Sequence, residues 1–291
     1  MGSEVVRFEA SEEFARRMDA EDPLRSFREE FLFPVHRGGE PVIYLVGNSL
    51  GLQPRKAKPY VLEALEDWER LGVEGHFLGQ RPWLPYHEML TEQTARLVGA
   101  QPLEVVVMNT LTVNLHLMMV SFYRPTRERR KILMEAGAFP SDQYAVASQV
   151  RFHGYSPEQD ILRLTPRAGE ETLRTEDILD TLERHGREIA LVLLGNVNYL
   201  TGQAFDMAAI TRAAHAQGCR VGFDLAHGAG NLQLSLRFGK EPRQLLEKLN
   251  AAGVICDFRS PDIIRAAPAP LYVSFLDVYR FAGVLERHAR D

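Results

Sequence analysis

Short apolar runs alternate with helix-like periodicity through the middle of the chain. Four of these runs have the length and composition of buried strands: residues 105–108, 131–134, 189–194 and 219–223. Helical stretches accompany them, at 111–119, from about 140, and at 207–217. Strands separated by helices favour an α/β fold with a parallel sheet covered on both faces. Because ligands of such sheets bind at the carboxyl ends of the strands, the residues that follow each strand are the first candidates for a site.

The two ends of the chain have a different pattern. Ser11 can cap a helix that runs through Met18, a short strand is expected at 41–46, and an amphipathic helix follows Pro59. The tail predicts a small α+β unit, with elements at 234–238, 244–252, 254–256, 263–267 and 273–288. We therefore expect three parts: an N-terminal helical arm over 1–40, a large domain over 41–232 and a small domain over 233–291.

The composition fits a globular protein that binds neither nucleic acid nor membranes. Of 291 residues, 45% are hydrophobic and 25% charged, and the net charge of −5 gives no basic surplus. The most apolar long run, 111–123, is too short to span a bilayer, and residues 1–20 lack the apolar core of a signal peptide. Only Cys219 and Cys256 are present, so no disulfide framework is expected. These features predict a cytoplasmic protein.

The segment around Asp224 carries the sharpest local signal. Asp224 ends an apolar strand and His227 follows three residues later. A carboxylate at this place suits a protonated ring nitrogen, and in pyridoxal-phosphate enzymes such an aspartate keeps the pyridine ring protonated. An aspartate that caps the next helix explains the same residues equally well.

Two further segments follow predicted strands. Residues 109–114 open a helix, where free backbone N–H groups and threonine hydroxyls suit a phosphate; an ordinary threonine cap is the simpler interpretation. In 138–142, Phe139 could stack on a flat ring and Asp142 could accept a hydrogen bond from it. A helix start with proline in the first position explains that segment as well.

Arg265 is the lone charge in an apolar strand run. Such a guanidinium can bind a substrate carboxylate with two hydrogen bonds, although a solvent-facing strand residue fits the same pattern. His76 and Ser49 are weaker candidates for a site. The histidines and cysteines have no metal-ligand spacing, so no metal site is expected.

In order along the chain, these segments resemble those of kynureninases. The matching strings are YLVGNSLGLQP at 44–54, GQRPW at 79–83, NTLTVNLH at 109–116, AFPSD at 138–142, GFDLAH at 222–227 and IRAAPAPLY at 264–272. The resemblance implies a fold-type-I pyridoxal-phosphate hydrolase that forms a homodimer. Such an enzyme cleaves the Cβ–Cγ bond of L-kynurenine to give anthranilate and L-alanine, or that of 3-hydroxykynurenine to give 3-hydroxyanthranilate and L-alanine. The reaction belongs to tryptophan catabolism and NAD biosynthesis.

The resemblance also implies the residues of the site. Those expected to contact the cofactor are Leu111, Thr112, Phe139, Pro140, Ser141, Asp142, Asp224 and His227. Arg265 would bind the α-carboxylate of the substrate, and His76 and Ser49 would face the aromatic end of the substrate. Gly195 stands where some family members have a serine that contacts the cofactor.

The chain departs from the family at one important place. The family has its Schiff-base lysine one strand after the Asp-x-Ala-His string, but here Asn231 runs almost directly into the small C-terminal unit. A large internal block is therefore absent, and the sheet is expected to be incomplete. The five lysines of the chain are Lys56, Lys58, Lys131, Lys240 and Lys248, and none follows the string as the family requires. The catalytic lysine stays unassigned, and this chain is expected to be inactive.

Two other interpretations stay open from the sequence. Cysteine desulfurases, which are related pyridoxal-phosphate enzymes, also carry Asp-x-Ala-His, although they lack the strings around Asn114 and Trp83. A chain without the lysine could also be a non-catalytic pseudoenzyme or a defective isoform.

Overall fold

The computed structural model describes residues 7–230, 233–239 and 241–288. Contacts between elements divide the chain into two compact units: residues 85–230 form one, and residues 1–84 together with 231–291 form the other. We call them the sheet unit and the terminal unit. Residues 41–84, which the sequence assigns to the large domain, belong to the terminal unit in this division. The three-part domain organisation stays a prediction. Asn231 and Lys240 lie outside the described residues.

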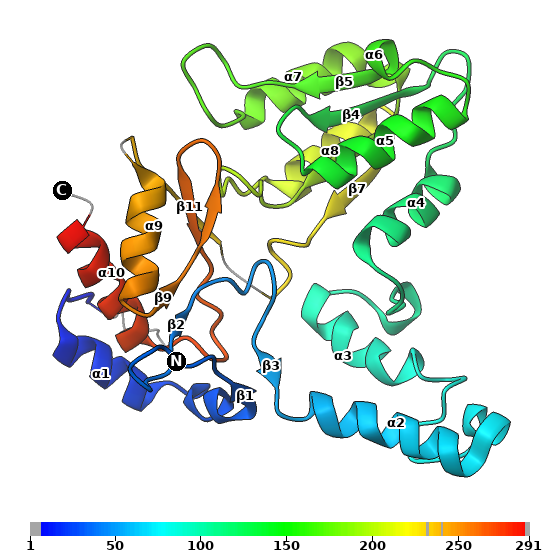
Figure 1. The fold of residues 1–291 in the computed structure, drawn as a ribbon. Coiled ribbons are helices and arrows are strands. Elements are labelled where there is room, and N and C mark those ends of the chain that lie inside the picture. The colour runs from blue at the N-terminus through cyan, green and yellow to red at the C-terminus, as the bar shows by residue number, and fades with distance from the viewer. Residues whose placement is uncertain (1–6, 231–232, 240, 289–291) are drawn as a thin grey trace. The chain divides into compact units, whose positions relative to one another are not determined.

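A four-stranded parallel sheet forms the centre of the sheet unit (Figure 1). Its order is β5-β4-β6-β7, with the strands at Ile161–Leu164, Lys131–Glu135, Ile189–Gly195 and Arg220–Asp224. The central strand β6 is apolar and its first six residues are buried, as expected of a parallel strand covered on both faces. The edge strand β7 is only half-buried or exposed.

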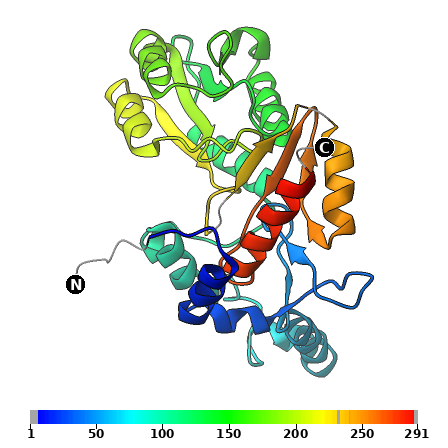
Figure 2. The same ribbon diagram turned by 90° about the vertical axis from the view of Figure 1, so that its left-hand side faces the viewer.

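Helices cover both faces of this sheet (Figure 2). Side chains alternate between the faces: Ile132 and Met134 of β4 pack in one core cluster and Leu133 in the other. The first cluster contains α4 and α5, at Leu111–Phe122 and Pro140–Phe152. The second contains α7 and α8, at Thr175–His185 and Met207–Ala216. The unit also includes α3, η3, α6 and η4, at Glu88–Val98, Pro102–Glu104, Pro157–Asp160 and Gly186–Glu188.

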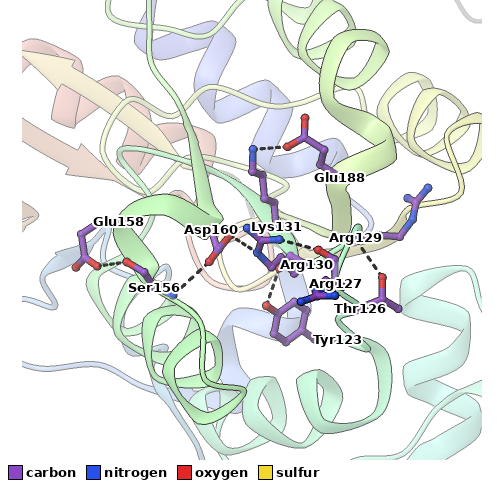
Figure 3. Close-up of polar contacts among 10 residues, drawn as sticks. All are labelled: Tyr123, Thr126, Arg127, Arg129, Arg130, Lys131, Ser156, Glu158, Asp160 and Glu188. Atoms are coloured by element: carbon purple, nitrogen blue, oxygen red, sulfur yellow. Dashed lines mark hydrogen bonds and ion pairs between the residues drawn. The ribbon is translucent and has the colours of Figure 1, made fainter.

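A polar network fixes the amino end of the sheet (Figure 3). Arg130 Nε donates to the buried Asp160 carboxylate at 2.8 Å, and the Tyr123 hydroxyl donates to the carbonyl of Arg130 at 2.7 Å. Burial raises the pKa of Tyr123 to about 12. Lys131, at the start of β4, pairs with Glu188. These contacts join the helices to the strand starts, at the end of the sheet opposite to the expected ligand site.

The described residues of the terminal unit form three small sheets. In the largest, β10, β11 and β8 are antiparallel, at Asp257–Arg259, Ile263–Ala266 and Leu234–Arg237. The parallel pair of β2 with β9 joins Ile43–Tyr44 to Val254–Ile255, and β1 with β3 joins Phe31–Leu32 to Gln53–Pro54. Its helices are α1, η1, α2, η2, α9 and α10, at Glu12–Glu21, Arg25–Glu30, Ala57–Leu71, Gly72–His76, Pro242–Ala251 and Phe275–His288.

The periodicity predicted most of these elements. The Ser11 cap is confirmed, since its hydroxyl accepts from Phe14 N at 3.1 Å. The prediction of a strand at 105–108 is wrong: η3 ends at Glu104, and residues 105–108 form no strand. Val106 and Met108 are exposed there, because no neighbouring strand pairs with this run in the described part of the chain. The strand expected at 41–46 is reduced to β2.

Apolar side chains remain exposed on α2 and α4. On α2, the face that the sequence predicts to be buried is exposed, with Val61 62%, Leu65 53% and Trp68 66% accessible. On α4, Leu111, Val113 and Leu117 are also exposed. Among the described residues, no helix has the length and apolar character needed to cross a membrane.

Candidate functional site

The carboxyl end of the sheet brings two distant aspartates together. Asp224 is the last residue of β7, and Asp142 lies in the first turn of α5, directly after the loop that follows β4. Their side chains share a hydrogen bond, so one carboxyl carries a proton when they meet. Asp224 also accepts from Ala226 N at 2.8 Å, and Asp142 from the Ser141 hydroxyl at 3.3 Å. Both segments singled out in the sequence therefore meet at one place.

Burial and neighbouring charge perturb these acids. Burial, followed by the charge and hydrogen bond of Asp224, raises the pKa of Asp142 to about 7. Burial also raises the pKa of Glu135, the last residue of β4. With one shared proton, the buried Asp142 and the half-buried Asp224 together carry one negative charge, which a protonated ring nitrogen would neutralise. No group of acids, histidines or cysteines in the described residues is arranged to hold a metal ion.

Three rings gather beside the acid pair. Phe139 packs edge-on against Tyr199 with centroids 5.0 Å apart, and His227 lies 6.3 Å from Phe139 and 6.4 Å from Tyr199. The rings come from the loops after β4, β6 and β7. Tyr199 is a site residue that the sequence reasoning missed. The strand β6 before it was predicted, so its loop after the strand end could have been searched in the same way.

Asn198 shapes the loop that carries Tyr199. Its amide group donates to Glu135 at 2.9 Å and to the Gly137 carbonyl at 3.1 Å. Its oxygen accepts from the backbone of Leu200 at 2.9 Å and of Thr201 at 2.8 Å. One buried amide thus ties the loop after β6 to the loop after β4.

Gly195 fits this crowded place for a steric reason. A Cβ atom at Gly195 would lie 3.2 Å from the Val197 carbonyl oxygen and 3.3 Å from Glu135 Oε1. A side chain there requires Glu135 or the loop to shift. The serine contact of some family members therefore has no counterpart in this chain.

The first turn of α4 offers backbone donors. The Thr110 side chain makes no capping hydrogen bond, so the ordinary threonine cap is not what the sequence forms here. Asn109 before it has a φ of +43°, a conformation that few residues other than glycine adopt. Leu111 and Thr112 are exposed in this first turn. Uncapped N–H groups at a helix start suit a phosphate.

These features fit pyridoxal phosphate. The acid pair suits its ring nitrogen, the three rings suit its flat face, and the start of α4 suits its phosphate. Pro140 provides the first helical position of α5 and so places Ser141 and Asp142 in its first turn. All the expected cofactor residues lie within the sheet unit; the roles assigned to them stay a proposal.

The expected substrate residues lie in the terminal unit. Arg265 on β11 is buried, with 1% of its side chain exposed, and is paired with Asp257 on β10. The alternative interpretation, that Arg265 is a solvent-facing strand residue, is therefore wrong. Ser49 lines a cavity of about 290 Å³ that Asp257 and Arg259 also line. His76 is exposed, and its ring packs edge-on against Trp83 at 5.4 Å.

No lysine lies at the carboxyl end of the sheet. Residues 85–230 are all described, and Lys131, at the amino end of β4, is their only lysine. Of the others, Lys56 pairs with Glu30 at 3.7 Å, Lys58 is exposed and Lys248 lies on α9. Covalent attachment of a cofactor beside Asp224 therefore has no candidate lysine within the sheet unit.

Comparison with known proteins decides the family. Residues 202–285 match the family described as the kynureninase C-terminal domain. A kynureninase of Myxococcus xanthus is 50% identical over 420 aligned positions, which cover 98% of this chain and 99% of that protein. The chain belongs to the kynureninase family. Pyridoxal phosphate is the cofactor of this family, in agreement with the chemistry of the residues around Asp224.

The same comparison measures the absent block. An alignment of 420 positions against 291 residues leaves at least 129 positions of the Myxococcus kynureninase without a residue from this chain. A kynureninase of Koribacter versatilis is 65% identical over 232 residues, which cover 80% of this chain but 55% of that protein. The chain spans about half the length of this and of several other kynureninases. The matched 232 residues are close in number to the chain up to Asn231, where the sequence places the break.

Solved structures support the fold. The chain is similar to a lysine-to-alanine mutant of C-DES with glycine covalently linked to its PLP cofactor, with a TM-score of 0.67 and 11% identity. The likeness covers 88% of this chain and 98% of that chain. The cystine C–S lyase C-DES with cysteine persulfide gives a TM-score of 0.51. The expected fold-type-I architecture is confirmed.

Proposed function

We propose that this chain carries the cofactor-ring site and the substrate-carboxylate site of a kynureninase, and lacks the lysine that completes them. The substrate class is L-kynurenine or 3-hydroxykynurenine, whose Cβ–Cγ bond a complete enzyme hydrolyses to anthranilate or 3-hydroxyanthranilate and L-alanine. The observation that carries the proposal is the hydrogen-bonded acid pair of Asp142 and Asp224 beside three aromatic rings. In this chain we expect ligand binding without turnover.

Each residue has a role in this proposal. Bound pyridoxal phosphate supplies an electron sink for the carbon atoms of the substrate. Asp224 keeps the proton on the ring nitrogen, and Asp142 holds Asp224 in place by their shared hydrogen bond. Phe139 and His227 position the ring, while Leu111 and Thr112 present the first turn of α4 to the phosphate. Arg265 orients the substrate carboxylate, and Ser49 and His76 face its aromatic end.

We infer a cytoplasmic homodimer for the complete protein. The support for a dimer is the apolar surface on α2 and α4, where large side chains are exposed in the isolated chain. The composition, with no basic surplus, supports neither nucleic acid nor membrane as a partner.

Turnover by matched proteins tests the proposal. The chain, and a chimera that inserts the additional segment of the Myxococcus kynureninase after Asn231, are incubated with pyridoxal phosphate and L-kynurenine, and anthranilate is measured by fluorescence. We expect anthranilate from the chimera and none from the chain, because only the chimera has the lysine that moves the α-proton. Anthranilate from the chain itself would contradict the proposal, as would a chimera that releases sulfide from cysteine and leaves kynurenine intact.

A further inference from the structure

Asp257 and Arg265 face each other directly across the antiparallel strands β10 and β11. The Asp257 carboxylate pairs with the buried Arg265 guanidinium through its Oδ2 atom. Arg259 lies two residues further along β10, on the same face, and donates to the same Oδ2 at 3.2 Å. Two guanidinium groups therefore share one carboxylate oxygen.

The cavity beside this cluster reaches only part of it. Its lining includes Ser49, Asp257 and Arg259, but Arg265 does not belong to the lining. The Arg265 side chain is 1% exposed, whereas that of Arg259 is 36% exposed. A carboxylate that enters from the cavity meets Asp257 and Arg259 before it can reach Arg265.

The charges of the cluster favour a second anion. Within these three side chains, two guanidinium groups face a single carboxylate. Arg259 Nε is buried and has no hydrogen-bond partner in the described part of the chain, so Arg259 has donor capacity left.

We propose that Asp257 is an internal stand-in for the substrate carboxylate: it pairs with Arg265 in the absence of substrate. When the substrate carboxylate binds Arg265, Asp257 stays paired with Arg259. The inference rests on the proposed role of Arg265 and assigns two further positioning residues, Asp257 and Arg259. The exchange breaks one ion pair and forms another, with no covalent change. It keeps the buried Arg265 charge paired at all times, which avoids the cost of an isolated buried charge.

Variants of the two new residues give opposite expectations. Asp257→Asn removes the competing carboxylate, so the apparent dissociation constant for a small carboxylate falls about tenfold, which corresponds to about 1.4 kcal/mol. Arg259→Gln leaves Asp257 with Arg265 as its sole partner in the cluster, so the dissociation constant rises severalfold. Asp262→Asn is the matched control, because Asp262, in the turn between β10 and β11, pairs with Arg237 of β8 at 3.2 Å and does not line the cavity.

The test uses acetate as the probe and the full chain without pyridoxal phosphate. The thermal midpoint is measured against acetate concentration at constant ionic strength, with chloride as the comparison anion. We expect acetate to stabilise the Asp257→Asn variant at the lowest concentrations and the Arg259→Gln variant at the highest. Equal acetate dependence in wild type, Asp257→Asn and Arg259→Gln would overturn the inference.

A separate titration with pyridoxal phosphate keeps the two proposals distinguishable. Normal cofactor binding together with equal acetate dependence rejects only the stand-in role of Asp257. If Asp257→Asn fails to fold, Asp257→Ser takes its place in the acetate comparison. Acetate-dependent stabilisation that survives Arg265→Gln in the Asp257→Asn background would also overturn the inference, since the anion would then bind elsewhere.

Discussion

Asp142 and Asp224 are joined by a hydrogen bond between their side chains, although they belong to α5 and β7. The strand order explains how they meet: β6 lies between β4 and β7, so the segments that follow these strands emerge at one end of the sheet. Burial of Asp142 and the neighbouring Asp224 raise the pKa of Asp142 to about 7, and that property leads to the first prediction.

The free energy of unfolding is expected to fall as the pH rises from about 4 to about 7. The folded chain keeps the proton of Asp142 up to a pKa of about 7, whereas the unfolded chain loses it near 3.8. Asp142→Asn removes this titration and should flatten the pH dependence. Relative to wild type, the Asp142→Asn chain should therefore gain a few kcal/mol of unfolding free energy at pH 8 compared with pH 4, since a pKa that rises from 3.8 to about 7 corresponds to roughly 4 kcal/mol.

Urea unfolding at pH 4, 6 and 8 measures this effect. Asp206→Asn is the control: Asp206 caps α8 through Ala209 N, and asparagine is an equally good cap. If Asp142→Asn retains the pH dependence of the wild type, the shared proton does not lie on this pair.

Asp224→Ala is expected to weaken pyridoxal phosphate binding. The change removes a charge-assisted hydrogen bond to the ring nitrogen, typically worth about 1.5–3 kcal/mol, so the dissociation constant should rise about ten- to a hundredfold. A fluorescence titration measures it, again with Asp206→Asn as the control. Unchanged affinity would place the cofactor away from β7.

Asn198→Ala is expected to lower both stability and cofactor affinity. The buried Glu135 loses its donor, which raises its pKa further because the Asn198 hydrogen bond lowers it. The loss of buried hydrogen bonds should cost about 1–3 kcal/mol of unfolding free energy. Asn250→Ala, at an exposed position of α9, should change neither quantity. A destabilised Asn198→Ala chain that binds pyridoxal phosphate normally would separate Tyr199 from the site.

Gly195→Ser is expected to destabilise the chain by about 1–3 kcal/mol, because the added atoms overpack the space beside Glu135. Gly222→Ala is the comparison, since its added Cβ would lie 3.6 Å from Leu193 Cδ1, an ordinary contact. Thermal midpoints of the two variants measure the difference. Equal midpoints would mean that the loop after β6 can move aside.

Periodicity predicted three of the four strands of the parallel sheet, β4, β6 and β7, but not β5. The strands β4, β6 and β7 carry apolar side chains to both faces of a sheet, and each has a neighbour to pair with. Residues 105–108 have the same composition but no partner strand, so they stay extended and exposed. The face of α2 with Val61 and Trp68 is exposed too, because hydrophobic pattern alone does not say whether a covering element is present.

The sequence predicted only part of the site, because some of its residues depend on contacts with distant segments. Strand ends pointed to Asp142 and Asp224, since both follow apolar runs. Asn198 and Tyr199 follow the predicted strand β6, but their residue types alone did not single them out. Asn198 acts through hydrogen bonds to Glu135, the last residue of β4, and to Gly137 in the loop after it. The pairing of Arg265 with Asp257 depends on the register of β10 against β11, and β10 was not expected from the pattern.

Binding of pyridoxal phosphate to the purified chain tests the central claim most directly. The chain is titrated with the cofactor, treated with borohydride, and mapped by peptide mass spectrometry. The account predicts saturable binding of one cofactor per chain, weakened by Asp224→Ala, with no lysine carrying a pyridoxyl group after reduction. Absence of saturable binding, or stoichiometric pyridoxyl on Lys131, Lys240 or Lys248, would contradict it.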